Sequence, residues 1–477
     1  MAEEVNLTST PAGAQETREV LSGVNTTTAP VLVGDSEYNE LIPEESHRVQ
    51  LGIYIDGTYN NRNNTRARQE HEKRESGAED YDEELANLWV EGQTSGTNYA
   101  TNVARMEPYY DVNQTQELII NKVYIEGIGT EDFENDDALN GGAMGVGSTG
   151  VKAKVYKALE ESVELISSLG VEKIGEFRID VFGFSRGAAA ARYLIHEVNK
   201  RAGSIKSRHP RNNKITYYEV DHGALGEGLA SKQIEVLPNR LKVNFVGLYD
   251  TVSSHGAGAI TGYQNDVSAL FLDAVRRANF TLHLTAGDEH RRNFALTNIN
   301  SARLIGRGEE YTLPGSHGDL GGAYNPITAD ELTYSAAEQE YLVSQGWYLE
   351  SQITHVPRRL RRDKIIARRD NISYEYARIP LTIMTDKAFE KGVPLDGAGL
   401  KAVHPIEDPR LTIVKTRIFD WIYNGGPAFS FENVSDREAY KSLRNQFLHF
   451  SAQNWHPVNF PNKTLFTRRR VRKIIDG

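Results

Sequence analysis

The 477-residue chain contains no cysteine. This absence excludes a disulfide framework, zinc sites built on cysteine and catalysis by a thiol. It does not indicate a compartment, because reducing and oxidising locations both tolerate proteins without cysteine. The glycine-rich stretch 141–147 lacks the lysine of a phosphate-binding loop, so we interpret it as an active-site loop. We expect neither a metal ion nor an organic cofactor.

Long apolar runs are also missing. No stretch approaches the ~18 to 20 consecutive apolar residues that a membrane-spanning helix needs. Residues 1–5 lack the basic start and the apolar core of a secretory signal. We therefore expect synthesis in the cytoplasm without a signal peptide. If the protein acts elsewhere, another machine must carry it there.

Basic residues are too few for a general nucleic-acid-binding surface. The chain has 54 Lys and Arg against 65 Asp and Glu, which gives a net charge of -11. A broad basic face is the usual footprint of such binding, so we do not expect nucleic acid as a partner. Two local basic clusters, at 358–369 and 468–473, are interpreted as solvated faces, with contact to anionic lipid as the alternative.

The order of apolar patterns indicates an α/β fold. Residues 1–46 have few apolar side chains to offset the entropy of ordering, so we predict a flexible or docking arm. Over 47–330, strands alternate with helices, which is typical of an α/β-hydrolase-like, mostly parallel sheet flanked by helices. Polar insertions interrupt it near 60–118, which we expect to be irregular, and near 203–238. Residues 331–477 are assigned to a helical or irregular C-terminal extension, for which membrane contact is a hypothesis.

Ser185 is at the centre of the most informative motif. The pentapeptide 183–187, GFSRG, follows the apolar run 177–182 and precedes the alanine-rich stretch 188–193. Strand, sharp turn and helix in this order are the setting of a nucleophile elbow, which projects a serine hydroxyl out of a sheet. The alternative is a tight glycine turn with a surface serine.

A serine nucleophile needs an imidazole to take its proton and a carboxylate to orient that imidazole. In α/β hydrolases the three follow in the order serine, acid, histidine. Asp250 comes directly after the apolar strand 241–249, at the edge where the elbow opens, although a cap or turn residue is an equal alternative. His317 lies in the glycine-rich segment 314–322. We predict Ser185, Asp250 and His317 as the catalytic triad.

Two other residues compete for these roles. Asp319 lies two positions after His317 and is an alternative acid, although a supporting role in bracing the loop is favoured. His404 is the alternative base if the C-terminal extension folds back over the site.

The oxyanion of an acyl-transfer intermediate needs preorganised N–H donors. These are usually the amide after the nucleophile and one amide from the loop that follows an early strand. They correspond to the backbone of Arg186 and of the turn Gly57–Thr58. Asp56 is expected to orient this turn, with a plain turn residue as the alternative.

Six ordered motifs resemble one known family. They are IDGTYNN at 55–61, TNV at 101–103, GIGT at 127–130, GFSRGA at 183–188, YDTV at 249–252 and HGDLGG at 317–322. Over roughly residues 48–330 the chain resembles the first family of type VI secretion lipase effectors, which are antibacterial toxins of bacteria. The resemblance implies phospholipase A activity on membrane glycerophospholipids in a competitor's periplasm, with the triad at Ser185, Asp250 and His317.

The resemblance also implies partners. These are membrane phospholipids as substrate, a secretion spike or tube component for delivery by contractile injection, and a cognate immunity protein. A lipase must lift an acyl chain out of a bilayer, so we expect an apolar surface beside the site. An esterase for soluble substrates and a non-catalytic binding protein of a secretion assembly are the competing hypotheses.

Overall fold

The computed structural model describes residues 45–201, 203–208, 215–256, 267–334, 336–357, 364–452, 459–463 and 470–477. The arm predicted at 1–46 falls outside this range except for its last two residues. Residues Ile42–Gly477 form one compact unit.

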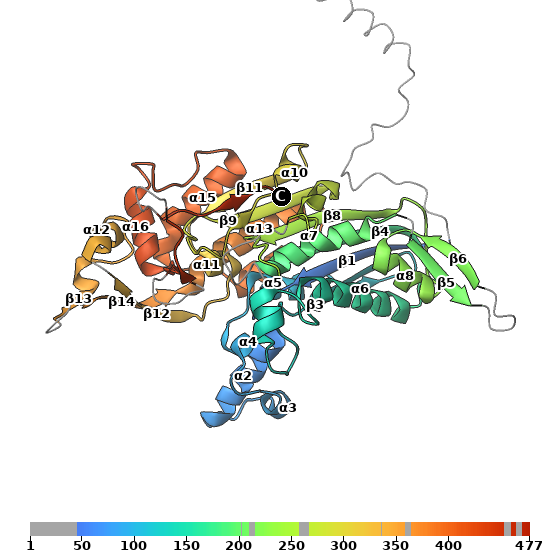
Figure 1. Cartoon of the computed structure of the whole chain (residues 1–477), viewed down its shortest axis with the longest axis horizontal. Coiled ribbons are helices and arrows are strands. Elements are labelled where there is room, and N and C mark those ends of the chain that lie inside the picture. The colour runs from blue at the N-terminus through green and yellow to red at the C-terminus, as the bar shows by residue number, and fades with distance from the viewer. Residues whose placement is uncertain are drawn as a thin grey trace, which may run out of the picture. The chain divides into compact units, whose positions relative to one another are not determined.

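A mostly parallel sheet organises this unit (Figure 1). Its strand order is β11-β9-β8-β4-β1-β3-β2, and β7 pairs with the start of β4. Only the pairing of β2 with β3 is antiparallel in this sheet. The strands are β1 (His47–Ile55), β2 (Asn113–Gln114), β3 (Leu118–Ile125), β4 (Lys173–Phe184), β7 (Glu235–Val236), β8 (Leu241–Tyr249), β9 (Phe280–Ala286) and β11 (Gly308–Leu313). The predicted fold class is confirmed.

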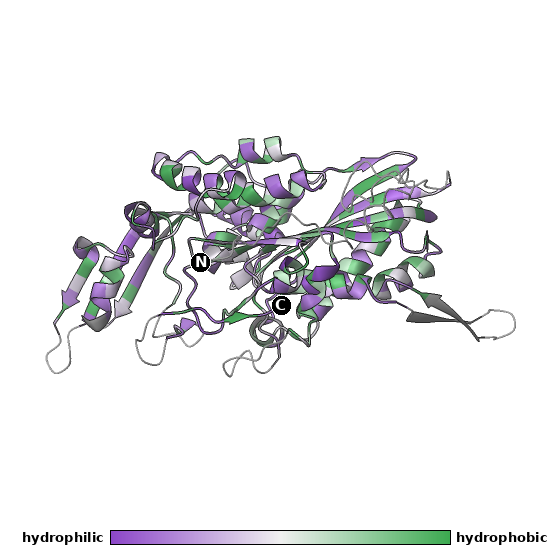
Figure 2. Ribbon diagram, turned by 90° about the horizontal axis from the view of Figure 1, so that it is seen from above, coloured by the Kyte–Doolittle hydropathy of each residue, from purple (hydrophilic) through white to green (hydrophobic). Residues whose placement is uncertain are grey.

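Both faces of the sheet are buried, which explains the nearly continuous apolar strands. Side chains alternate between the faces with a period of two, so Ile53 joins one hydrophobic core and Tyr54 the other. On the second face, Tyr54 stacks on Phe182 with ring centroids 4.7 Å apart, and Phe245 packs 5.6 Å from Phe182. In Figure 2 the hydrophobic green residues lie along the central strands.

Helices cover each face. One face packs against α6 (Val151–Ser168), α7 (Arg186–Val198), α8 (Gly223–Ser231) and η3 (Leu272–Arg277). The other face packs against α5 (Asn102–Met106) and α13 (Arg378–Glu390). Residues 188–191 of α7 are alanines without exposed surface, which lets this helix lie close to the strands. Because α13 belongs to the C-terminal extension, the extension supplies part of the cover of the second face.

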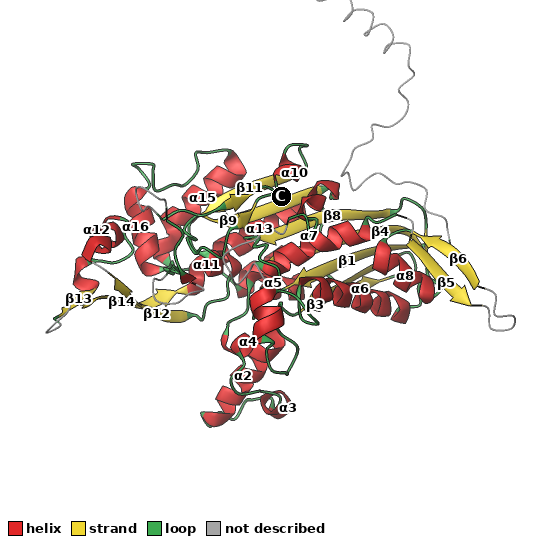
Figure 3. Cartoon of the chain, in the orientation of Figure 1, coloured by secondary structure: helices red, strands yellow, loops and turns green. Residues whose placement is uncertain are grey.

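The insertion after β1 is helical rather than irregular (Figure 3). It contains α2 (Arg62–Glu75), α3 (Glu83–Asn87), α4 (Thr94–Thr97), α5 and η1 (Glu107–Tyr109). The buried residues of α2 are Asn64, Thr65 and Ala67, so there was no periodic apolar pattern to recognise. The insertion near 203–238 contains the hairpin β5 (Gly203–Arg208) and β6 (Ile215–Val220), followed by α8.

The C-terminal extension is not only helical or irregular. It includes a three-stranded antiparallel sheet with the order β12-β14-β13. These strands are β12 (Ile327–Tyr334), β13 (Ile353–Val356) and β14 (Lys364–Ser373). Its helices are α12 (Ala336–Ser344), η4 (Glu350–Gln352), η5 (Tyr374–Ala377), α13, α14 (Gly397–Val403), η6 (Pro409–Leu411), α15 (Thr412–Asn424) and α16 (Arg437–Gln446). The strands escaped prediction because β14 carries part of the basic cluster, in which Arg369 is buried against Asp330.

Several short elements lie between the larger ones and near the C-terminus. The helix α10 (Asn300–Arg303) precedes the strand β11. Near the C-terminus, β15 (Ile474–Ile475) pairs in parallel with β10 (Leu296–Thr297). Among the helices of the described residues, none has the length and apolar character needed to cross a membrane.

The topology places a crevice at the carboxyl ends of β1 and β4. The chain leaves β1 to form β3 on one side and later β4 on the other, which makes this a topological switch point where ligands bind in α/β sheets. Ile55 pairs with Gly183, and Phe184 pairs with Tyr249. The residues that follow β1, β4 and β8 therefore emerge at the same edge.

Candidate active site

Ser185 has a strained backbone at the turn from β4 into α7. Its φ of 60° and ψ of -124° are rare for a residue with a side chain. Two hydrogen bonds hold it there: its N–H donates to Tyr249 O at 3.0 Å, and Val252 N donates to its carbonyl at 3.3 Å. The strained geometry is that of a nucleophile elbow.

The two glycines of the pentapeptide are required by close backbone contacts. A Cβ at Gly183 would lie 2.5 Å from the carbonyl oxygen of Gly187. A Cβ at Gly187 would lie 2.3 Å from the carbonyl oxygen of Asp56. The turn therefore packs against the loop after β1, and this contact fixes how far the serine lies from that loop.

His317 and Asp250 meet although 67 residues separate them in the chain. His317 is the first residue of α11 (His317–Gly321), and its Nδ1 lies 2.5 Å from Asp250 Oδ2. Because an ionised carboxylate can only accept, Nδ1 carries the proton and Nε2 is left as the basic nitrogen of the neutral ring. His317 and Ser185 line the same cavity.

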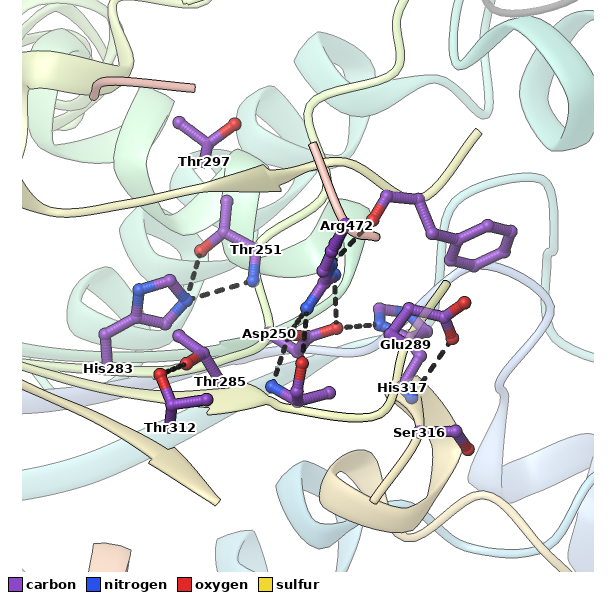
Figure 4. A network of polar contacts seen from close by, with 12 residues as sticks. Asp250, Thr251, His283, Thr285, Glu289, Thr297, Thr312, Ser316, His317 and Arg472 are labelled. Carbon is purple, nitrogen blue, oxygen red and sulfur yellow. Dashed lines mark hydrogen bonds and ion pairs between the residues drawn. The ribbon is translucent and has the colours of Figure 1, made fainter. Parts of the chain in front are cut away.

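Asp250 is fully buried and strongly hydrogen-bonded (Figure 4). Its Oδ1 accepts from Ala286 N at 2.8 Å, and Arg472 donates to both oxygens at 2.6 and 2.8 Å. Burial alone would raise the pKa of Asp250, but the Arg472 charge and the His317 hydrogen bond hold it well below its ordinary value. The carboxylate is ionised at neutral pH.

The His317 ring is enclosed by aromatic and charged groups. Phe184 and Phe294 lie with ring centroids 4.6 and 5.1 Å from the imidazole. Burial lowers the pKa of His317 below 6.5, although Asp250 acts in the opposite direction. The imidazole is therefore neutral at pH 7, as a general base must be.

Glu289 supports the backbone of this loop. It accepts from His317 N at 3.2 Å and forms an ion pair of 2.8 Å with Arg291. Burial opposes ionisation of Glu289, but Arg291 lowers its pKa to about 2. The charge of Arg291 is therefore balanced within the protein.

The loop after β1 offers one of its two predicted oxyanion donors. Gly57 N donates to Asp56 Oδ1 at 2.7 Å, so this N–H is not free and the prediction for Gly57 is corrected. Within the described residues, the Thr58 amide donates to no other group, and Thr58 lines the cavity. Arg186 is the first residue of α7, where helix geometry leaves N–H groups without an intrahelical acceptor.

Asp56 organises this loop by hydrogen bonds. Besides Gly57 N, it accepts from the hydroxyls of Thr101 and Tyr124, each at 2.7 Å. Burial raises the pKa of Asp56 to about 6, against the effect of these donors.

Asp319 and His404 lie in different settings. Asp319 accepts from Ser316 N at 2.8 Å and from His449 Nδ1 at 2.7 Å, so it braces the loop that carries His317. His404 packs against Tyr109 with ring centroids 6.2 Å apart and is absent from the lining of the cavity, within the part of the chain described. The structure thus does not bring the alternative base to Ser185.

The cavity at Ser185 has a volume of about 630 Å³. Much of its wall is aromatic or aliphatic, with Tyr59, Ala138, Phe184, Val252, Phe294 and Tyr324 among the lining residues. Arg186 and Arg292 also line it. Among the described residues neither forms an ion pair with a carboxylate, in contrast to Arg291.

Arg186 is a buried cation with neutral partners. Its Nε donates to Thr58 Oγ1 at 2.7 Å, and its Nη atoms donate to the carbonyls of Gly141 and Gly142 in η2 (Ala138–Met144). Burial lowers its pKa to about 10, which leaves it charged at neutral pH. The glycine-rich loop interpreted as part of an active site thus lies at the cavity, held by Arg186.

Sequence reasoning missed several residues of this network. His283 accepts from Thr251 N at 3.0 Å and contacts Glu310 at 2.8 Å, which fixes the residue after Asp250 from behind. Arg472 was counted within a basic cluster, and no local signal links it to Asp250, which lies 222 residues away. Within the described residues, no group of three or more His, Asp or Glu side chains is arranged to hold a metal ion.

A family model and solved structures of other proteins are similar to this chain. The family model described as the catalytic domain of the Tle1-like phospholipase effector of the type VI secretion system (T6SS) matches residues 50–345. A solved structure described as the Tle1 effector bound to the VgrG spike from the type 6 secretion system is similar, with a TM-score of 0.56 and 20% identity. That alignment covers 91% of this chain and 95% of the other.

A second solved structure, of an uncharacterized protein from Pseudomonas aeruginosa, aligns with a TM-score of 0.39 and 17% identity. It covers 87% of this chain and 53% of the other. None of the curated proteins matches the sequence. The likeness to the Tle1 structure is one of fold, and the match of the family model covers most of the sheet and the elbow.

Proposed function

The chain belongs to the family of Tle1-like phospholipase effectors of the type VI secretion system, and on that premise we propose that it is a serine phospholipase A. It hydrolyses an acyl ester of membrane glycerophospholipids with Ser185 as nucleophile, His317 as base and Asp250 as the carboxylate that orients His317. The observation that carries the proposal is the 2.5 Å contact between His317 Nδ1 and Asp250, in a cavity that also contains the strained Ser185.

The reaction proceeds through an acyl-enzyme. His317 Nε2 takes the proton of Ser185 Oγ as the oxygen attacks the ester carbonyl, and the C–O bond to the glycerol then breaks. The protonated imidazole gives its proton to the departing lysophospholipid oxygen. Water, activated by the same imidazole, then releases the fatty acid. Asp250 stays ionised and stabilises the imidazolium that forms twice in this cycle.

The oxyanion is stabilised by the amides of Arg186 and Thr58. The first lies at the N-terminus of α7, where the helix dipole favours negative charge. The second is carried by the loop that Asp56 organises. Removing one such donor typically costs about 100- to 1000-fold in turnover.

The cavity wall supports a phospholipid as substrate. Its aromatic and aliphatic side chains suit an acyl chain, whereas Arg186 and Arg292 are cations without carboxylate partners among the described residues. A phosphodiester is an anion that such arginines bind well. A neutral soluble ester would fill only the apolar part of this site, and this is the second candidate function.

The delivery partner of this protein is inferred from its family. The solved Tle1 effector is bound to a VgrG spike, and we infer a spike component as the delivery partner of this chain. The protein would act against competing bacteria in the periplasm at the membrane, and a cognate immunity protein would protect the producing cell.

Mass spectrometry of lipids tests the proposal. Vesicles of phosphatidylethanolamine and phosphatidylglycerol are incubated with the wild-type protein and with Ser185→Ala. We expect free fatty acid and lysophospholipid with the wild type, and a loss of at least ~1000-fold with the variant. Hydrolysis of a soluble ester without any lysophospholipid would favour the second candidate. Equal toxicity of the two proteins in a target cell would favour a non-catalytic binding role.

A further inference from the structure

The segment 470–477 docks directly behind the proposed catalytic acid. Its strand β15 pairs with β10, and Gly477 N donates to Asn298 Oδ1 at 3.0 Å. Asp476 accepts from the side chains of Asn298 and Asn300, each at 2.8 Å. These contacts fix the backbone on the C-terminal side of Arg472.

Arg472 reaches from this segment to both oxygens of Asp250 (Figure 4). Its Nη1 and Nη2 lie 2.6 and 2.8 Å from Oδ1 and Oδ2, the two-pronged geometry that a guanidinium forms with a carboxylate. Its Nε donates to Phe294 O at 2.9 Å, and Nη1 also donates to Ala286 O at 3.1 Å. The side chain is only 8% exposed, so this is a buried, oriented contact rather than a solvated basic face.

The contact between Arg472 and Asp250 also affects the charge balance around His317. Asp250 faces His317 and Arg472, whereas His317 faces Asp250, Arg291 and Glu289. The Arg291 charge is balanced by Glu289, so Arg472 is the cation that offsets Asp250. Without it, an uncompensated buried carboxylate would face the imidazole and favour the protonated ring.

We propose that Arg472 is a positioning residue of the catalytic site. Its two-pronged contact fixes the plane of the Asp250 carboxylate, and its charge keeps His317 unprotonated, and thus basic, to lower pH. The inference rests on the proposed hydrolytic function and adds the C-terminal segment to the machinery of that site.

Two variants of Arg472 distinguish its effect on the orientation of Asp250 from the effect of its charge. Arg472→Lys keeps the charge but loses the two-pronged contact, so we expect a lower plateau of kcat/KM with an unchanged acid limb. Arg472→Gln removes the charge, so the plateau falls and the acid limb also moves to higher pH, by on the order of one pH unit. The loss at the plateau should be on the order of 10- to 100-fold, the scale of a misplaced catalytic group.

The experiment uses the full chain and a soluble p-nitrophenyl butyrate substrate, with kcat/KM measured from pH 5 to 9. Lys473→Gln is the matched control, because it removes a positive charge from the exposed neighbouring residue and should reproduce the wild-type profile. Circular dichroism melting checks that each variant is folded. If Arg472→Gln is unfolded, Arg472→Lys carries the test through its plateau and its acid limb.

A second readout does not need turnover. NMR titration of the His317 imidazole in a Ser185→Ala background should give a higher pKa when Arg472→Gln is added. An unchanged pKa and acid limb in Arg472→Gln, or a wild-type plateau in Arg472→Lys, would overturn the inference. If the wild type and Ser185→Ala hydrolyse equally little, the proposed function fails, and the titration still decides on Arg472.

Discussion

Replacing Asp56 by asparagine separates the charge of this residue from its hydrogen bonds. Asn has nearly the same shape, and its oxygen can accept from Gly57 N and Thr101 while its amide donates to Tyr124. The loop that carries the Thr58 amide should therefore keep its conformation. We expect Asp56→Asn to retain hydrolytic activity within about tenfold, whereas Asp56→Ala should lose about 100-fold, because the Gly57 amide and two hydroxyls lose their acceptor.

The charge of Asp56 has an effect on stability with a definite sign. Burial raises its pKa from 3.8 to about 6, so the folded protein favours the protonated form. The unfolded chain ionises first, and the stability that this group contributes is lost as the pH rises from about 3.8 through about 6. At 1.36 kcal/mol for each pH unit, the loss amounts to about 3 kcal/mol at pH 8.

Asn does not titrate, so the free energy of unfolding of Asp56→Asn should rise relative to that of the wild type as the pH rises. Urea denaturation at pH 4 and pH 8 measures the difference in free energy of unfolding between Asp56→Asn and the wild type. We expect this difference to move in favour of the variant by up to about 3 kcal/mol across the range. A difference that is constant with pH, or that moves against the variant, would refute the reasoning about burial.

Three further predictions concern the site and its mouth. His317→Ala should lower turnover by at least ~1000-fold, whereas His404→Ala should leave it within a few fold; the reverse result on a soluble ester would exchange their roles. Arg292→Gln should lower kcat/KM for phosphatidylglycerol by about three- to fivefold, the worth of one exposed ion pair, and leave a neutral ester unaffected. Leu139 is 62% exposed beside Ala138 of the cavity wall, so Leu139→Asp should slow hydrolysis of vesicles about tenfold without affecting a soluble ester, as expected for one apolar side chain of about 1.5 kcal/mol. Val434→Asp is the control, because this side chain is 81% exposed and neither neighbour of Val434 in the sequence lines the cavity. An equal effect of both changes on vesicles would argue against a membrane-facing rim at Leu139.

The parts of the site that follow buried strands were predictable from sequence. Ser185 and Asp250 each come at the end of a run of apolar residues, and parallel strands bring their carboxyl ends to one edge. The glycines around Ser185 marked the sharp turn. Pairing of Phe184 with Tyr249 then brings the two residues side by side, which the order of strands alone did not state.

Other parts had no local signal. The helix α2 buries only one apolar side chain, that of Ala67, so it shows no apolar periodicity. Arg472 lies in a run of basic residues that has the composition of a solvated surface, and only the folded chain brings it to Asp250. The hydrogen bond from Gly57 N to the Asp56 side chain likewise depends on local geometry, which the residue types do not reveal.

The proposed nucleophile and the proposed base are held by different means. Ser185 and Asp250 both have positive φ at the ends of neighbouring strands, and their N–H groups donate to Tyr249 O and Leu284 O, so the sheet itself sustains their strain. The N–H of His317 instead donates to the side chain of Glu289, and Asp319 braces the glycine-rich loop that carries it. Changes in those supports should therefore reduce turnover before they reduce the stability of the sheet. The sheet and elbow form one part of the proposed site. The C-terminal extension adds Arg472 at Asp250 and His449 at Asp319, the residue that braces the loop of His317.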